Sequence, residues 1–379
     1  MASPVSKQRL ASLDALRGFD LFVLVALGPL VLSLTHCLGA ERYAGLRAVF
    51  THVDWQGFSP WDLVMPLFVF MSGVGIPFAL SRYRNGANRS AFLRRLFKRV
   101  ALLWLLGMMV QGNLLSLDPS RVYLYSNTLQ AIAAGYLIAA LLYTSTQLRT
   151  QIVVAVLLLL GYWAAMEFIT VGHYGGGNYT PDGNLAEWLD RTVLGRFRDG
   201  AHLDEQGTVV FAPWYHYTWL LSTATFGVTA LTGVFAGSLA RADWGGMKKV
   251  LAYLLLGVAL IFAGWLWGMD IPIIKPIWTS SMVLYSSGWC FVLMALFYFL
   301  FDVCHLTFGL DFLRVYGMNS ITAYVLSEVV NFRGIAHSLL YGLEQYIGSY
   351  YAFVLTLSQV TIVFLLLYAM YRRNIFLKV

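Results

Sequence analysis

Long apolar runs separated by short polar segments occupy most of the chain after residue 14. About ten of these runs approach the ~20 residues that a helix needs to cross a bilayer. The predicted spans are residues 15–38, 62–80, 100–115, 128–143, 152–170, 217–239, 250–269, 277–300, 316–332 and 351–371. The pattern therefore favours an all-α integral membrane protein, built as a polytopic bundle of about ten transmembrane helices.

Composition and charge agree with a membrane location. Hydrophobic residues make up 59% of the 379 residues and charged residues only 12%, whereas about 25% of residues are charged in ordinary soluble domains. The formal net charge of +7 could indicate nucleic-acid binding. The basic residues, however, gather in short segments between apolar runs, as topology signals do. We therefore expect the lipid bilayer, and no nucleic acid, as a partner.

The basic segments also predict an orientation. Seven Lys and Arg residues fall between residues 82 and 99, and further basic residues occur at 241–249 and 372–378. Since basic residues favour the cytoplasmic side, we expect both termini inside and residues 51–62 outside. We expect residues 1–379 to form a single integral-membrane domain, with a polar outer loop at about 172–213.

The segment 51–62 concentrates polar and aromatic residues between two apolar runs. Gly57 and the pair Ser59-Pro60 mark a turn. Ser59 is predicted to cap a helix, and Pro60 is predicted to be the first residue of that helix.

His52 is the candidate base of this segment. An imidazole has an ordinary pKa of about 6.5, so it can accept a proton at neutral pH. Asp54 or Asp62 could orient the ring and stabilise its charged form. Trp55 and Gln56 add hydrogen-bond donors, and the indole adds a flat apolar face.

A metal site is not expected. His36, His52 and Asp54 are the residues of suitable type nearest in sequence, but their spacing matches no compact ligand motif. The three cysteines are too few and too scattered for a metal site or a disulfide framework.

Polar residues elsewhere have two interpretations each. Arg94, Arg95, Lys98 and Arg99 lie along one side of a helix, where they either mark topology and contact lipid head groups or bind the phosphates of a ligand. Asn319 lies in a predicted span, where a polar group either bonds a neighbouring helix or serves the function. Aromatic and amide residues at 172–217 suit either sugars or a membrane-interface belt.

Five segments, taken in order, resemble the heparan-α-glucosaminide N-acetyltransferase family, especially its bacterial members without a long N-terminal extension. The segments are SLDALRG at 12–18, HVDWQGFSPWD at 52–62 continuing to MPLFVF at 65–70, GNLAEWLDR at 183–191, KPIWTSS at 275–281 and GMNSI at 317–321. Each is weak alone, and their shared order over most of the chain makes the resemblance specific.

The resemblance implies a multi-pass transmembrane acyltransferase. Such an enzyme takes acetyl-CoA from the cytosol and acetylates the amine of a terminal glucosamine on the far side of the membrane. The family's essential histidine, in a His-x-x-Trp-x-Gly pattern, falls on His52. Some members carry an asparagine in the first span that helps catalysis; the aligned position here is Gly28, which departs from that pattern. The resemblance also implies a bacterial cytoplasmic membrane as the location.

Motifs, charge and resemblance together give three groups of candidate residues, with acetyl-CoA as co-substrate and no metal. The expected catalytic residues are His52, Asp62 and Asp54. The expected acetyl-CoA-binding residues are Arg17, Arg94, Arg95, Lys98, Arg99 and Asn319. The expected acceptor-binding residues are Trp55, Gln56, Lys275, Trp278, Thr279 and Glu328.

Four questions stay open at this point. The acetyl group either moves directly from acetyl-CoA to the amino-sugar acceptor or is carried transiently by His52. The chain could instead be a transporter of sugars or small metabolites, although no paired repeat halves of the kind many transporters show are visible. It could also be an O-acyltransferase acting on a surface glycan. Assembly as a homodimer is a further possibility.

Overall fold

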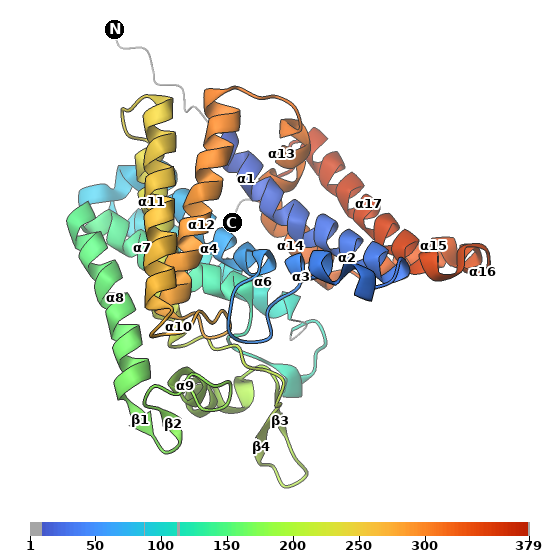
Figure 1. Ribbon diagram of the computed structural model, residues 1–379, viewed down its shortest axis with the longest axis horizontal. Helices are drawn as coiled ribbons and strands as arrows, with labels where there is room; N and C mark the ends of the chain where they lie inside the picture. Colours follow the sequence, from blue (N-terminus) through green and yellow to red (C-terminus); the bar gives the residue numbers. More distant parts are fainter. Residues whose placement is uncertain (1–9, 87, 112–113, 378–379) are drawn as a thin grey trace. The chain divides into compact units, whose positions relative to one another are not determined.

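The computed structural model describes residues 10–86, 88–111 and 114–377, and its secondary structure is almost entirely helical (Figure 1). Within these residues, eight helical segments are long and apolar enough to cross a membrane. They are Ala11–Cys37, Pro60–Arg84, Thr128–Ser145, Leu148–Phe168, Ser222–Ala240, Gly246–Trp267, Ser280–Val303 and Phe332–Arg372. These segments confirm an all-α, polytopic membrane protein.

Two predicted spans differ from these eight segments. The predicted span 100–115 lies within α6 (Arg89–Val110), a helix of 22 residues whose first half is rich in arginine and lysine. The predicted span 316–332 is divided, because α13 (Leu310–Met318) ends and α14 (Ser320–Val329) begins at Asn319. Asn319 has a non-helical backbone, and its side-chain amide donates to the carbonyl of Ile375 at 3.1 Å.

By its internal contacts the chain forms two compact units. The first contains the described residues up to Arg42, then Asp243–Leu256, and the described residues from Phe291 onward. Its elements are α1 (Ala11–Phe22), η1 (Val23–Leu27), α2 (Gly28–Cys37), η7 (Phe299–Val303), α13, α14, α15 (Phe332–Leu340), η8 (Tyr341–Leu343), α16 (Glu344–Ile347), η9 (Gly348–Tyr350) and α17 (Tyr351–Arg372), with parts of α11 (Gly246–Trp267) and α12 (Ser280–Tyr298).

A glycine contact brings α1 and α13 together in this first unit. A Cβ atom at Gly18 would lie 1.9 Å from the carbonyl oxygen of Leu313, and one at Gly317 would lie 2.1 Å from that of Asp14. Only glycine permits this close backbone approach. Asp302 accepts from the first backbone N–H groups of α1, at Ala11 and Ser12, with distances of 3.1 and 3.2 Å. A carboxylate stabilises a helix N-terminus in this way.

The second unit contains Tyr43–Ala242 and Gly257–Cys290. Its elements are α3 (Ala44–Val49), η3 (Pro60–Leu63), α4 (Val64–Val74), α5 (Ile76–Leu80), η4 (Ser81–Gly86), α6, η5 (Pro119–Arg121), α7 (Thr128–Ser145), α8 (Leu148–Phe168), β1 (Thr170–Val171), β2 (Tyr174–Gly175), α9 (Leu185–Leu194), η6 (Gly195–Phe197), β3 (Ala201–Leu203), β4 (Val209–Phe211) and α10 (Ser222–Ala240), with the remaining parts of α11 and α12. Along the chain, the division between the two units falls within a short 3-10 helix, η2 (Glu41–Tyr43).

Helices α4 and α10 form the centre of the second unit. Gly73 and Gly233 let the two backbones touch, since added Cβ atoms would lie 1.9 and 2.0 Å from the carbonyls of Ala230 and Phe70. Helix packing through small residues is typical of membrane proteins. The short helix η3 continues directly into α4 and carries Asp62. The contact between α4 and α10 therefore holds Asp62 in place.

The segment 172–213, predicted as a polar loop, has structure of its own. It contains the antiparallel hairpins β1–β2 and β3–β4 on either side of the helix α9. Asn184 begins α9 by accepting from the backbone N–H of Glu187 at 2.8 Å, as an N-cap residue does. Gly175, Gly176 and Gly177 have φ values of 81°, 63° and 79°, a backbone region that favours glycine.

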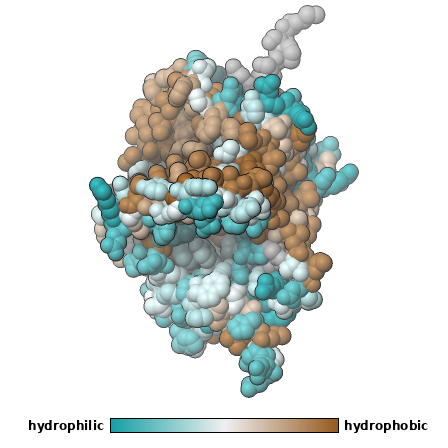
Figure 2. All heavy atoms as spheres, turned by 90° about the vertical axis from the view of Figure 1, so that its right-hand side faces the viewer, coloured by the Kyte–Doolittle hydropathy of each residue, from teal (hydrophilic) through white to brown (hydrophobic). Residues whose placement is uncertain are grey.

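Figure 2 shows one face of the molecule, on which hydrophobic side chains gather over a broad area. Many large apolar side chains of α8, α11 and α17 are exposed, among them Leu157, Leu255 and Leu365. Exposure of apolar side chains on this scale is expected for surfaces that contact lipid.

Candidate active site

The loop that carries His52 is fixed to the start of the following helix. Ser59 is the N-cap of η3 and Pro60 is its first residue, which confirms both predictions for this turn. The backbone N–H of Ser59 donates to Oδ2 of Asp62 at 3.0 Å, and the Ser59 hydroxyl lies 3.0 Å from the same oxygen. This reciprocal capping box orients the Asp62 carboxylate back over the loop.

Asp62 is the carboxylate that contacts His52. Its Oδ1 lies 2.6 Å from Nδ1 of the imidazole, whereas the exposed Asp54 makes no contact of this kind in the described part of the chain. The side chain of Asp62 is 1% exposed and that of His52 is 45% exposed. Nδ1 of His52 is therefore held by a buried carboxylate, and Nε2 lies on the same, partly exposed ring.

A third charged group completes this contact. Nζ of Lys275 lies 3.3 Å from Oδ1 of Asp62 and 3.1 Å from Nδ1 of His52. The Lys275 side chain is 5% exposed. Burial lowers the pKa of Lys275 to about 8, although the neighbouring Asp62 carboxylate opposes this shift. Lys275 was predicted to bind the acceptor; in the structure it contacts His52 and Asp62, two of the three predicted catalytic residues.

Two backbone contacts hold the His52 loop against the segment that carries Lys275. The backbone N–H of Gly57 donates to the carbonyl of Ile273 at 2.9 Å. Gln56 and Ile274 form an isolated antiparallel bridge. These contacts join two segments that are more than 200 residues apart in sequence, and they bring the imidazole and the ammonium group together.

Trp55 and Gln56 differ in their surroundings. The indole N–H of Trp55 donates to the carbonyl of Tyr179 at 2.8 Å, and its ring meets that of His216 edge to face at 5.8 Å. The Gln56 side chain is exposed and forms no hydrogen bond within the described residues. Of the two, only Gln56 has a side-chain donor that is still available.

Trp278 and Thr279 lie in a buried turn before α12. The indole N–H of Trp278 donates to the Thr229 hydroxyl at 3.1 Å, and the side chain is only 2% exposed. The hydroxyl of Thr279 accepts from the backbone N–H of Ile274 at 3.1 Å and lies 2.9 Å from the carbonyl of Pro272. Both side chains thus fix the turn that carries Lys275, and their predicted contact with an acceptor stays a prediction.

Aromatic and acidic residues surround Trp55 on the same side of the second unit. The hydroxyl of Tyr179 donates to Glu167 at 3.0 Å, and the indole N–H of Trp163 donates to Asp270 at 3.0 Å. Nδ1 of His216 is buried and has no hydrogen-bond partner within the described residues. Tyr179 belongs to the segment 172–217, whose aromatic residues the sequence analysis assigned to sugars or a membrane-interface belt. The sequence analysis missed Glu167 and Asp270, because their proximity to Tyr179 and Trp163 depends on tertiary contacts.

A buried ion-pair network holds the segment after β2. The Arg198 side chain is fully buried and lies 2.5 Å from a carboxylate oxygen of Glu187. The guanidinium of Arg191 donates to the other oxygen of Glu187 at 2.6 Å. The Glu187 carboxylate therefore joins α9 to Arg198, and this ion pair stabilises the packing of the segment 185–198.

Asp190 links α9 to the start of α10. Its two oxygens accept from the backbone N–H groups of Trp219 and Leu220 at 2.7 and 3.0 Å. Burial raises the pKa of Asp190 to about 7, although the two hydrogen bonds oppose this effect. The carboxyl group is therefore expected to titrate close to neutral pH.

The basic segment 82–99 begins at the far end of the helical segment that starts near Asp62. Arg82 follows Asp62 by 20 residues along a mostly helical segment, which corresponds to about 30 Å at ~1.5 Å per residue. Arg94, Arg95 and Lys98 are exposed. Arg99 instead stacks on the ring of Tyr136, with 4.0 Å between its guanidinium carbon and the ring centroid.

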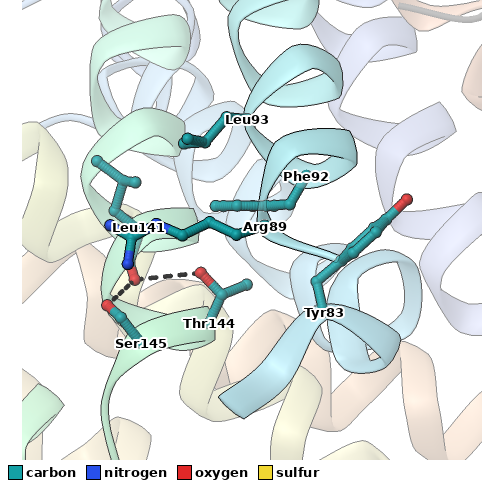
Figure 3. A pocket seen from close by; sticks show the side chains of 7 residues that line it. All are labelled: Tyr83, Arg89, Phe92, Leu93, Leu141, Thr144 and Ser145. Carbon is teal, nitrogen blue, oxygen red and sulfur yellow. Dashed lines mark hydrogen bonds between the residues drawn. The ribbon is translucent and has the colours of Figure 1, made fainter. Parts of the chain in front are cut away.

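An open pocket of about 200 Å³ lies beside the start of α6. Figure 3 shows the side chain of Arg89 crossing from α6 toward α7, beside the ring of Phe92 and the hydroxyls of Thr144 and Ser145. Both hydroxyls lie within hydrogen-bonding distance of the carbonyl of Leu141. Sequence analysis missed this pocket, although Arg89 belongs to the basic segment that it identified.

The remaining predicted residues belong to the first unit. Arg17 is a half-buried residue of α1. Asn319 is 2% exposed, and its side-chain oxygen has no hydrogen-bond partner within the described residues. Glu328 on α14 is exposed. Their roles in binding acetyl-CoA or an acceptor stay predictions. Across all described residues, no three His, Cys, Asp or Glu side chains gather as metal ligands would.

The fold and this site define a class of protein: a polytopic helical membrane protein with an exposed imidazole held by a buried carboxylate. Residues 9–179 match the family model described as "Heparan-alpha-glucosaminide N-acetyltransferase, catalytic". The chain is 26% identical over 373 residues to the heparan-alpha-glucosaminide N-acetyltransferases of Homo sapiens and Mus musculus, covering 85% and 86% of this chain. These matches show that the chain is similar to the heparan-α-glucosaminide N-acetyltransferase family.

The chain spans about half the length of these relatives, 53% of the human protein and 54% of the mouse protein. The family model covers the whole His52 loop, Asp62 and the basic segment 82–99. Lys275 lies outside the matched range of that model.

Proposed function

We propose that this protein transfers the acetyl group of acetyl-CoA to the amine of a glucosamine-type sugar, with His52 as general base. The observation that carries the proposal is the 2.6 Å contact between Nδ1 of His52 and the buried Asp62. A proton on Nδ1 is held by the carboxylate, so Nε2 of the exposed ring is left as the acceptor. This is the arrangement that a base-assisted attack on a thioester requires.

In the proposed reaction, Nε2 of His52 takes a proton from the ammonium group of the sugar. The amine nitrogen then forms a bond to the thioester carbonyl carbon, the carbon–sulfur bond breaks, and the nitrogen releases its second proton to solvent to give the neutral amide. The imidazolium of His52 returns its proton to the departing thiolate, which leaves as free CoA. Asp62 stabilises the imidazolium while it exists. General-base catalysis of this kind is worth about 10²–10⁴ in rate.

Further side chains of the second unit support this chemistry. The exposed side-chain amide of Gln56 is a donor for the negative charge that develops on the thioester oxygen. The half-buried rings of Trp55 and Tyr179 offer apolar faces to a sugar, and Glu167 offers a carboxylate that attracts a cationic amino group. We assign the acceptor to this end of the second unit.

The donor is assigned to the opposite end of the bundle. Arg82 lies about 30 Å from Asp62 by the helical rise of the intervening segment, and Arg89, Arg94, Arg95 and Lys98 follow it on the next helix, α6. Their charges suit the phosphates of CoA, and the excess of basic residues favours a cytosolic position for this end. The pantetheine arm would then have to extend through the bundle toward His52. Both termini would be cytoplasmic and the acceptor would bind at the outer face of the membrane.

The experiment is a thiol-release assay on detergent-solubilised protein. Free CoA thiol should appear when acetyl-CoA and glucosamine are both present, and should not appear with N-acetylglucosamine, which lacks a free amine. Thiol release with a hydroxyl acceptor alone would favour an O-acyltransferase. Absence of thiol release across an acceptor panel, together with uptake of a labelled sugar by vesicles containing the protein, would favour a transporter and contradict the proposal.

Direct transfer and an acetyl-His52 intermediate are distinguished in the same system. Incubation with labelled acetyl-CoA in the absence of any acceptor should leave no base-labile label on His52 if transfer is direct. A stoichiometric, base-labile adduct at His52 would instead support the two-step route.

A further inference from the structure

Lys275 is a buried cation that touches both members of the His52–Asp62 pair. Its Nζ lies 3.1 Å from Nδ1 of the imidazole and 3.3 Å from Oδ1 of Asp62. A buried ammonium requires a paired or hydrogen-bonded partner, and the carboxylate of Asp62, which is 1% exposed, is one. The imidazole is partly exposed, and Lys275 contacts its buried edge.

The turn that carries Lys275 is fixed from several directions. The backbone N–H of Trp278 donates to the carbonyl of Lys275 at 3.0 Å. The hydroxyl of Tyr162 and the hydroxyl of Ser222 both donate to the carbonyl of Ile277. Trp278 has a φ of 51°, a left-handed conformation that a bulky residue adopts only when its surroundings determine it. Lys275 therefore has little freedom to leave the pair.

The three distances determine where the protons lie. Nδ1 of His52 can form one hydrogen bond in the plane of the ring. Its 2.6 Å distance to Asp62 is shorter than its 3.1 Å distance to Lys275, so the Nδ1 proton is donated to the carboxylate. The ammonium of Lys275 then donates to Asp62 and places a positive charge beside the ring. A second proton on the imidazole, at Nε2, would have to form next to that charge.

We propose that Lys275 is a positioning residue that lowers the proton affinity of His52, so that Nε2 is unprotonated and ready to act as a base at neutral pH. Asp62 and Lys275 thus have opposite effects on the ring: the carboxylate stabilises a charged imidazole and the ammonium opposes it. The electrostatic inference stands on the geometry alone, whereas its purpose in catalysis rests on the proposed function of His52.

The segments adjoining the His52 loop carry other charged and titratable groups. Asp54 lies on the same loop, Arg47 lies on α3, and His216 and Tyr217 precede α10. Burial and the field of Asp62 raise the pKa of Tyr217 to about 12, so this residue stays neutral at the pH where an imidazole titrates. Of the charged groups in the described part of the chain, Lys275 is the one in contact with both the ring and its carboxylate.

The protonation state of Lys275 fits this role. With a pKa of about 8, lowered by burial against the opposing effect of Asp62, Lys275 is largely charged at pH 7. It is charged throughout the range below pH 7 in which an ordinary imidazole takes up its proton. The positive charge of Lys275 is therefore present throughout the pH range in which His52 would take up its second proton.

The test measures how fast diethyl pyrocarbonate modifies His52 between pH 5 and 9, with mass spectrometry of the peptide that contains His52. The reagent attacks neutral imidazole, so the pH midpoint of the rate reports the loss of the imidazole proton. Removing a cation at this distance should raise that midpoint by about 1–3 pH units. We expect this shift in Lys275→Met and no shift in Lys275→Arg, which keeps the charge.

The controls separate charge from packing. Lys248→Met makes the same chemical change at an exposed lysine of α11 and should leave the midpoint of His52 unchanged. Lys275→Gln keeps a donor for Asp62 without the charge and replaces Lys275→Met if that variant does not fold. A role limited to packing would change the rate at every pH without moving the midpoint. An equal midpoint in the wild type and in the neutral variants, or an equal shift in Lys275→Arg, would overturn the inference.

Activity provides an independent readout. The acidic limb of kcat for acetyl transfer should move to higher pH in Lys275→Met by the same amount as the modification midpoint, with the wild-type profile restored in Lys275→Arg. If the modification midpoint shifts but the protein transfers no acetyl group, the proposed function fails and the coupling of Lys275 to His52 stands. If transfer occurs and neither profile shifts, the inference about Lys275 fails and the proposed function stands.

Discussion

Nδ1 of His52 lies 2.6 Å from a carboxylate oxygen of Asp62, although the imidazole is 45% exposed and the carboxylate is 1% exposed. A buried, fixed carboxylate thus accepts a hydrogen bond from an imidazole that is partly exposed at the surface. Asp62 is fixed because its second oxygen accepts from the backbone N–H of Ser59 at 3.0 Å. The orientation of the ring is therefore determined by the cap of a transmembrane helix, and this dependence can be tested by mutation.

Asp62→Asn should reduce acetyl transfer strongly. The amide keeps the shape of the side chain but removes the negative charge that stabilises an imidazolium at His52. Loss of a hydrogen bond to a charged group is worth about 1.5–3 kcal/mol, which corresponds to roughly 10–150-fold in rate. Steady-state kinetics on protein in detergent should show the loss in kcat. The comparison is Asp54→Asn on the same loop: a larger loss in that variant would show that the structure points to the wrong carboxylate.

His52→Ala tests the base itself. An exposed loop side chain contributes little to helix packing, so membrane insertion and acetyl-CoA binding should stay close to wild type. The rate should fall by about 10²–10⁴, the usual contribution of positioned proton transfer. The residual rate should rise with pH, because more of the acceptor amine then loses its proton without help. Retention of the wild-type rate would remove His52 from the mechanism.

Local features of the site could be predicted from sequence because they depend on neighbouring residues. Ser59, Pro60 and the start of the helix follow from turn and capping preferences. The choice between Asp54 and Asp62 could not be predicted, since both lie near His52 in sequence. The capping box decides it, because the side chain that returns to Ser59 also reaches the imidazole.

The contact between His52 and Lys275 joins residues 223 positions apart, and no periodicity or motif predicts such a pairing. The same limit applies to the links of Trp55 with Tyr179 and His216. The helical class could be predicted because apolar runs of this length have few other structures. The interruption at Asn319 could not, because it depends on a hydrogen bond to Ile375 from a later segment.

Orientation in the membrane is predicted from the basic residues and can be measured directly. In a background without native cysteines, Gln206→Cys lies at the turn between β3 and β4, and Arg84→Cys lies in η4. A membrane-impermeant maleimide added to intact cells should label the first and not the second. Labelling of position 84 alone would reverse the predicted topology and would exclude a cytosolic donor site at α6.

The basic residues at the start of α6 should control the affinity for acetyl-CoA. Arg89→Gln, Arg94→Gln and Arg95→Gln each remove a charge that could hold a phosphate of CoA. Loss of one charge-assisted hydrogen bond should weaken acetyl-CoA binding by about 1.5–3 kcal/mol, with little change in acceptor affinity. Isothermal titration with acetyl-CoA and, separately, with the amino sugar would show the difference. Arg373→Gln, an exposed arginine after α17, is the control; wild-type acetyl-CoA affinity in all three α6 variants would assign the cluster to topology alone.

The buried Asp190 should make the stability of the folded protein depend on pH in a defined direction. Burial raises its pKa to about 7 from 3.8, so between about pH 4 and pH 7 the folded state binds more protons than the unfolded state. Stability contributed by this group is therefore present below pH 4 and is lost as the pH rises through 7. The slope for one proton is about 1.4 kcal/mol per pH unit.

Asp190→Asn should flatten this dependence, because the amide does not titrate. It should also lower stability at low pH, because the amide has a single acceptor oxygen for the backbone N–H groups of Trp219 and Leu220, and an unpaired buried donor costs about 1–3 kcal/mol. Thermal unfolding of detergent-solubilised protein, followed by tryptophan fluorescence from pH 4.5 to 8, would measure both effects. Asp182→Asn changes an exposed carboxylate that pairs with Arg191 at 3.3 Å and should keep the wild-type slope. An unchanged slope in Asp190→Asn would mean that Asp190 is ionised throughout this range and that the two backbone hydrogen bonds outweigh its burial.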